Sequence, residues 1–190
     1  FNVQQTSTPS TGGIISWGYN SANVTSNVVK SFPPTILPNP GTPSYGQAQS
    51  ITISGQPYGN GTYVVTASTN TYGDPVSAFD KNTSTNWMSV SFSYDQSAPY
   101  NYATTFANYY TVRQATTASG STYYGEWIQI QLPSAISLTS YTVVFPSPTR
   151  STNLWYLVGS TNGSTWTLLD TQTQSSASYT GSPTNPNTYT

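Results

Sequence analysis

The segment from Ile128 to Leu132 alternates apolar and polar side chains without a break. In an extended chain Ile128, Ile130 and Leu132 would all face one side, because successive side chains point to opposite faces. Pro133 follows and ends the strand, since proline has no N–H to give to a β-ladder. The pattern predicts a strand with one buried face. No segment of the chain shows the apolar spacing of a long amphipathic helix.

Other short segments carry the same β signals and are separated by Gly, Pro and Asn. They are 14–19, 28–32, 51–54, 63–68, 136–145, 154–160 and 166–170. Asn162-Gly163, between the last two, predicts a two-residue type I′ turn, because both central residues of that turn need positive φ. Short strands punctuated by turns predict an all-β sandwich or barrel.

The two ends of the chain are less regular. Residues 1–57 are rich in Pro and Gly and are predicted to be an irregular extension or arm, followed by a domain over 58–174. Residues 33–43 hold too many prolines for a helix or a central strand. We interpret them as an extended connector lying along a neighbour, and a disordered linker is the alternative. Residues 175–190 form a Ser/Pro-rich tail with no clear strand.

Composition excludes some classes of function. Charged residues are 5% of the chain and the net charge is −1. No basic patch is therefore available to neutralise a phosphate backbone, and nucleic-acid partners are not expected. No apolar run approaches the roughly 20 residues of a membrane span, so membrane insertion is not expected. There is no cysteine, and an aromatic content of 14% favours a folded chain over a disordered one. Because the chain starts at Phe1, we expect a processed or incompletely observed polypeptide.

Three segments together resemble the discoidin (coagulation factor 5/8 type C) family. Residues 78–87 match the loop pattern A-F-D-x-(N/D)-x-x-T-x-W, 126–132 match the W-I-x-I-x-L strand, and 159–166 match the G-S-x-(D/N)-G-x-x-W hairpin. The resemblance spans about residues 59–173. It implies an eight-stranded, jelly-roll-like β-sandwich with binding loops at one end. Family members bind glycans, phospholipid headgroups or protein partners, and many hold a structural calcium.

The amino-acid sequence of residues 58–63 and 125–127 is similar to that of variants in virion proteins of large double-stranded DNA viruses, such as those of algae. Two features depart from the family. The segment between the first two motifs is longer than in the family, because it carries a Tyr-rich stretch over residues 92–124. In addition, no closing strand is recognisable after the last hairpin. We therefore expect a closing strand beyond Thr190, or one supplied by another segment or subunit.

The resemblance implies a calcium site in the first of these motifs. Asp80 and Thr85 would supply side-chain oxygens and Asn82 its carbonyl, and hard oxygen ligands suit Ca²⁺. The alternative is that Asp80 only closes its loop by accepting backbone N–H bonds. No cofactor is expected to be required.

Aromatic residues are the candidates for ligand or partner binding, because a ring can stack on a sugar without any charge. They are Tyr72, Tyr94, Tyr100, Tyr102, Tyr109, Tyr110 and Trp155. The alternative, which the number of these rings favours, is packing against a neighbouring subunit. Trp87, Trp127 and Trp166 are expected to belong to the sandwich itself.

Four asparagines lie in N-x-(S/T) sequons and are glycosylation candidates if the chain follows a secretory route: Asn23, Asn60, Asn82 and Asn162. In a chain this rich in Asn, Ser and Thr, chance matches are expected.

The chain has few residues that could catalyse a reaction. It has no His to act as a general base, and among its acidic residues only Asp74 and Asp80 are close in sequence. We predict a non-catalytic structural or interaction protein, a minor capsid or fibre component that contacts capsid proteins or surface glycans in a virion. The alternative is a carbohydrate-binding module of a secreted adhesin or glycoside hydrolase.

Overall fold

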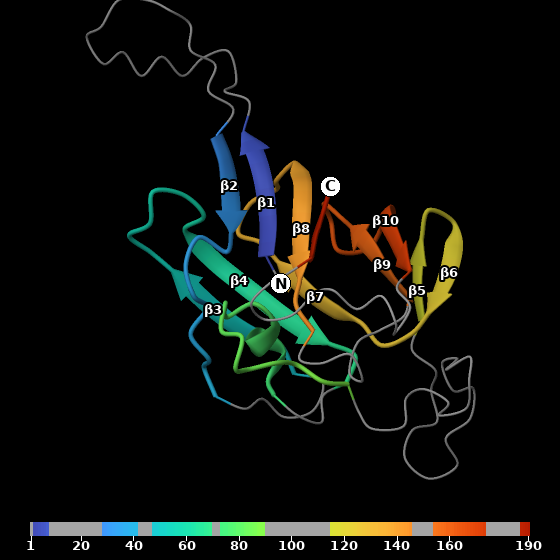
Figure 1. The fold of residues 1–190 in the computed structure, drawn as a ribbon, viewed down its shortest axis with the longest axis horizontal. Helices are drawn as coiled ribbons and strands as arrows, with labels where there is room; N and C mark the ends of the chain where they lie inside the picture. The colour runs from blue at the N-terminus through green and yellow to red at the C-terminus, as the bar shows by residue number, and fades with distance from the viewer. Residues whose placement is uncertain are drawn as a thin grey trace, which may run out of the picture.

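Strands make up nearly all the regular structure of the residues that the structure describes. A computed structural model describes residues 2–7, 28–41, 47–69, 73–89, 115–145, 154–173 and 187–190 (Figure 1). The strands are β1 (Asn2–Ser7), β2 (Val28–Phe32), β3 (Gln49–Ile53), β4 (Gly61–Ala67), β5 (Ala115–Ala118), β6 (Ser121–Tyr124), β7 (Ile128–Gln131), β8 (Leu138–Val143), β9 (Leu154–Gly159), β10 (Thr167–Thr173) and β11 (Asn187–Tyr189). The single helical element of the described residues is the 3₁₀ turn η1 (Pro75–Ala78). The predicted all-β class is confirmed.

The strands pair in four antiparallel groups. Their orders are β11-β8-β1-β2, β3-β4-β7, β10-β9 and β5-β6. In Figure 1 β1, β2 and β8 run across the diagonal direction of β4, while the β9–β10 and β5–β6 hairpins lie together at the other end of the molecule. The eight-stranded jelly roll that the discoidin resemblance implies stays a prediction.

The main core lies on one face of the β3-β4-β7 sheet. Side chains alternate along β3 and β4, so Ile51, Ile53, Tyr63 and Val65 are buried while the residues between them are less covered. The aliphatic residues of 127–132 pack against this cluster, as their period of two predicts. Full burial of such a side chain contributes about 1.5–3 kcal/mol, so this cluster is a major source of the stability of the sheet.

The Pro-rich segment after β2 closes the core and does not extend away from it. Leu37 is fully buried in the same cluster as Val76 and Phe79. Gln49, only 3% exposed, fastens the segment by donating from Nε2 to the Gly41 carbonyl (3.0 Å) and by accepting the Val76 N–H at Oε1 (2.9 Å). Over 33–41 the predicted extended connector therefore lies against the core, to which it contributes the buried side chains of Pro33 and Leu37, while residues 38–41 are exposed.

The predicted extension over 1–57 contributes three strands to sheets that also hold strands of the predicted domain. β3 pairs with β4 in the core sheet, and β1 pairs with β8, with Val3 opposite Tyr141. The predicted strand 28–32 coincides with β2. The β1–β8 pairing joins segments far apart in sequence, which local pattern cannot reveal, whereas β3 and β4 are separated only by residues 54–60. The predicted strand at 14–19 lies outside the described residues.

The expectation of a tail without a strand is wrong. Residues Asn187–Tyr189 form β11, which pairs antiparallel with β8 and places Tyr189 opposite Tyr141. A strand thus lies within residues 175–190, although Asn is depleted in strands and no apolar alternation marks this segment. The closing strand of the jelly roll that the discoidin resemblance implies stays a prediction. β1 and β11 flank β8 on its two sides.

The Tyr-rich insertion ends in a hairpin. Residues 115–124 form β5 and β6, joined by a two-residue turn in which Ser119 (φ 49°) and Gly120 (φ 79°) both have positive φ. That is the geometry predicted for Asn162-Gly163. At that second site only Gly163 has positive φ, and the connection between β9 and β10 is a longer loop over 160–166. The predicted hairpin exists, but its turn type was wrong.

Candidate functional site

The predicted calcium residues do come together in one exposed loop. Asp80 accepts the Asn82 N–H at Oδ1 (2.9 Å) and the Thr85 hydroxyl at Oδ2 (2.6 Å). The same hydroxyl lies 3.0 Å from the Asn82 carbonyl, and Asn82 Oδ1 accepts the Ser84 N–H (3.0 Å). The loop is therefore closed by its own hydrogen bonds, in line with the alternative interpretation that Asp80 closes the loop without calcium.

The donor set of this loop fits Ca²⁺ poorly. One carboxylate, one carbonyl and one hydroxyl converge, whereas Ca²⁺ takes six to eight oxygens. Both carboxylate oxygens already accept hydrogen bonds, and the Thr85 hydroxyl donates to one of them. Among the residues that the structure describes, no three or more His, Cys, Asp or Glu side chains gather. No step of the proposed function depends on this ion.

Trp155 lies in a packed cluster of rings and is not an open platform. Its indole meets Phe145 edge-on (centroids 5.7 Å apart) and Tyr189 edge-on (5.4 Å), and its Nε1 donates to the Tyr141 hydroxyl (3.2 Å). Tyr189 in turn stacks on Tyr141 with centroids 5.0 Å apart. Such edge-to-face and stacked contacts stabilise a core. This cluster joins β8, β9 and β11.

A hydrogen bond ties the same cluster to β10. The Tyr141 hydroxyl, in a side chain only 3% exposed, donates to Asp170 Oδ2 at 2.7 Å. Burial, and then the bond to the Asp170 carboxylate, raises the pKa of Tyr141. The bonds from Tyr141 and Gln172 lower the pKa of Asp170. Both shifts favour the neutral phenol beside the ionised carboxylate, so the pair acts as a structural link.

The three tryptophans predicted to be structural, Trp87, Trp127 and Trp166, are half-buried and lie outside the main core cluster. Trp87 donates from Nε1 to the Thr69 carbonyl (2.8 Å), and the Trp127 N–H donates to Ser68 Oγ (2.9 Å). Glu126 accepts the Ser68 hydroxyl (2.6 Å) and also that of Thr69. Two of the discoidin-like motifs thus meet at the end of β4 through polar contacts.

The sequon asparagines differ in their contacts. Asn162 is exposed, and its Oδ1 accepts backbone N–H groups of Ser164 (2.9 Å) and Thr165 (2.8 Å). Those bonds form an Asx-type loop and explain why no tight turn forms there. Asn60 is bound at both ends of its amide to the Gln56 backbone. Asn82 is exposed in the Asp80 loop.

A separate exposed surface carries aromatic and aliphatic side chains on neighbouring strands. Tyr123 of β6 packs on Tyr156 of β9 with ring centroids 4.3 Å apart. Tyr156 is 37% exposed, and Leu154 beside it on the same face of β9 is 45% exposed. We name Tyr123, Tyr156 and Leu154 the β6–β9 aromatic surface. Sequence reasoning missed it because β9 is apolar on both faces, so its pattern cannot tell the covered face from the open one.

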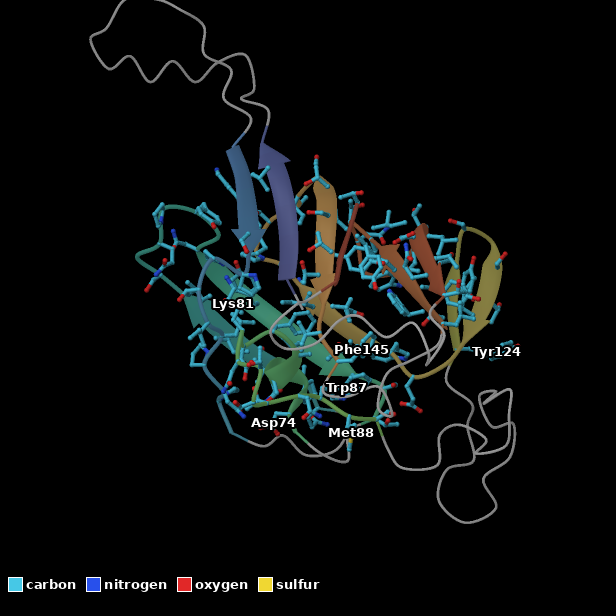
Figure 2. All side chains as sticks on the ribbon, in the orientation of Figure 1. Asp74, Lys81, Trp87, Met88, Tyr124 and Phe145 are labelled. Carbon is cyan, nitrogen blue, oxygen red and sulfur yellow. The ribbon has the colours of Figure 1, made fainter. Side chains whose placement is uncertain are left out.

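The hairpins around this surface are almost free of charge. Asp170 is the one charged residue in β5, β6, β9 and β10, and its side chain is engaged with Tyr141. Tyr124 (51% exposed) lies at the outer edge of the β5–β6 hairpin in Figure 2, while Asp74 and Lys81 lie on the other side of the view. The Ser119 N–H donates a hydrogen bond to the Trp166 carbonyl (3.0 Å), and this bond joins the β5–β6 hairpin to the β9–β10 hairpin.

Several candidate site residues lie outside the described residues, so their roles stay predictions. These are Tyr72, Tyr94, Tyr100, Tyr102, Tyr109, Tyr110 and Asn23.

No protein-family model, no curated protein and no solved structure shows significant similarity to this chain. In the part of the chain that the structure describes, no helix is long and apolar enough to cross a membrane. The discoidin resemblance therefore stays an interpretation of the motifs.

Proposed function

We propose that the chain is a non-catalytic interaction protein that contacts a neighbouring protein through the β6–β9 aromatic surface. The observation that carries this proposal is the pairing of Tyr123 with Tyr156 beside an exposed Leu154. Aromatic residues are enriched in protein interfaces and charged residues are depleted at their centres, and both properties describe this surface.

The discoidin-like motifs and their likeness to virion proteins support a more specific role. In this role the protein is a minor capsid or fibre component, and the aromatic surface packs on another subunit. A charge-poor chain rich in Ser, Thr, Asn and Tyr suits a subunit whose surface is covered in an assembly.

The test is incorporation into particles of a virus that encodes the chain. Density-purified particles would be analysed by quantitative mass spectrometry before and after a high-salt wash. We expect fixed stoichiometry for the unaltered chain, incorporation reduced at least tenfold for Tyr156→Asp, and no change for Ile36→Asp. Ile36 is a matched control because it is 58% exposed but lies after β2, outside the aromatic surface. Peptides that are absent or wash away would overturn the virion role.

A second candidate, carbohydrate binding, is favoured by the hydroxyl-bearing residues around the same rings. In the β9–β10 hairpin Thr171 is paired with Tyr156 and Thr173 with Leu154, which gives uncharged hydrogen-bonding groups beside a ring. A glycan array with the purified chain tests it. Binding that falls with Tyr156→Ala and persists with Ile36→Ser would support it, and a blank array with folded protein would sink it.

A further inference from the structure

We propose that the edge of β8 that holds β11 is an acceptor site for the C-terminal strand of a second copy of this chain. In the exchanged form the partner's strand would pair with β8 and place its tyrosine between Tyr141 and Trp155. This inference goes beyond the proposed function and does not depend on it.

The first observation is how β11 is attached. It is three residues long, and within the described residues it pairs with β8 alone. Tyr189 supplies its main side-chain anchor, stacked on Tyr141 (5.0 Å between centroids) and edge-on to Trp155 (5.4 Å). A strand that pairs along one sheet edge and is anchored by a side chain matches the way an extended peptide adds to a sheet, where main-chain hydrogen bonds give affinity and side-chain sites give specificity.

The second observation is that the acceptor site is built without β11. Trp155 is oriented by its bond to the Tyr141 hydroxyl (3.2 Å), and Tyr141 by its bond to Asp170 (2.7 Å). Phe145 also packs edge-on against the indole, with centroids 5.7 Å apart. The two rings that contact Tyr189 are therefore preorganised by bonds within β8, β9 and β10, which lowers the cost of binding a strand from elsewhere.

The third observation is the length of the segment that connects β10 to β11. Thirteen residues, 174–186, separate β10 from β11 in the sequence. Fully extended, a chain of that length spans at most about 45 Å, enough to reach an adjacent copy. Because the same contacts form within one chain or between two, exchange alters few interactions, and concentration decides which form prevails. High local concentration in an assembly favours the exchanged form.

The absence of cysteine allows a direct test. Thr142 and Thr188 are opposite each other in β8 and β11, with hydroxyl oxygens 3.2 Å apart, and any disulfide would come from introduced residues. A chain carrying Thr142→Cys is mixed with a differently tagged chain carrying Thr188→Cys, over a concentration series under mild oxidation. We expect a disulfide-linked heterodimer on non-reducing gels whose yield rises with concentration and falls at least fivefold when the Thr188→Cys chain also carries Tyr189→Ala.

A matched control lies in the core hairpin. Thr52 and Thr62 are also opposite each other, with hydroxyl oxygens 3.0 Å apart, but β3 and β4 are neighbouring strands of the core sheet. Chains carrying Thr52→Cys and Thr62→Cys, mixed in the same way, set the background from random collision. Circular dichroism checks that all single variants are folded.

Two results would overturn the proposal. One is a heterodimer yield no higher than that of the control mixture. The other is a double variant, Thr142→Cys with Thr188→Cys, that closes only within one chain at every concentration. Because both measurements use the purified chain alone, their failure leaves the role of the β6–β9 aromatic surface untouched, and the particle experiment tests that role separately.

Discussion

The Tyr141 hydroxyl on β8 donates a 2.7 Å hydrogen bond to the Asp170 carboxylate on β10, and so links two sheets that share no ladder. Trp155 of β9 donates to the same hydroxyl. One oxygen therefore fixes the position of the β9–β10 hairpin against the larger sheet, and a conservative change should show how much that link contributes.

Replacing Tyr141 with Phe keeps the ring but removes both hydrogen bonds. We expect the free energy of unfolding to fall by about 1–2 kcal/mol, because a bond to a charged group is lost and the Trp155 N–H loses its acceptor. Urea denaturation measures this. Tyr156→Phe, in a partly exposed ring, is the control and should change stability by less than about 0.5 kcal/mol. Equal effects of the two substitutions would contradict the structural role of the bond.

Alkaline pH should weaken the fold through Tyr63. This ring is fully buried and its hydroxyl donates to the Gly59 carbonyl at 2.8 Å. Burial, and to a smaller extent Tyr58, raises the pKa of Tyr63 to about 12. The unfolded chain loses this proton near pH 10, so stability that is fully present below pH 10 is lost as the pH rises through 12.

Thermal melts between pH 9 and pH 12 measure this loss. We expect Tm to be flat up to pH 10 and then to fall, and to fall less steeply in Tyr63→Phe, which has no proton to lose at that site. Because burial also raises the pKa of Tyr141, the variant should keep part of the slope. A Tyr63→Phe profile that matches the parent above pH 10 would contradict this assignment.

The β-class and most strand positions could be predicted because alternation is a local property. The aliphatic residues of 127–132 pack on the core as their spacing requires, and 28–32 coincides with β2. β11 could not be found this way. Asn187, Thr188 and Tyr189 carry no apolar alternation, and their strand exists because β8 offers an open edge and two rings for Tyr189.

Sites were harder to predict than strands. The oxygens of Asp80, Asn82 and Thr85 converge as the motif implies, but each already has a partner within the loop, which residue types alone do not show. Trp155 was a candidate for ligand binding because an aromatic ring can stack on a sugar, with packing against a neighbouring subunit as the favoured alternative. Its burial depends on Tyr189, which arrives from a distant segment.

Gly73 and Gly163 offer a matched pair, since both have φ of +71°. A Cβ at Gly73 would lie 1.8 Å from the Asn86 carbonyl oxygen, whereas one at Gly163 would meet nothing within 4 Å. We expect Gly163→Ala to cost about 1–2 kcal/mol, the penalty of a left-handed backbone for an ordinary residue. Gly73→Ala adds the cost of displacing the 86–87 backbone and should lose about 2–5 kcal/mol in all. Urea titrations of the two variants compare them directly, and equal losses would contradict the close approach of Gly73 to Asn86.

The Asp80 loop should be stable without calcium because its own hydrogen bonds close it. We expect a chelator to leave Tm unchanged within about 1 °C and Asp80→Ala to lower stability by about 1 kcal/mol, since the carboxylate bonds to Asn82 and Thr85 are lost. Asp80→Asn separates charge from hydrogen bonding, because its amide keeps one acceptor oxygen, and it should cost less than Asp80→Ala. Millimolar Ca²⁺ is the opposing test. A rise in Tm of several degrees that disappears in Asp80→Asn would show that the loop reorganises around the ion, and would replace the self-closed loop with the calcium site that the motif implies.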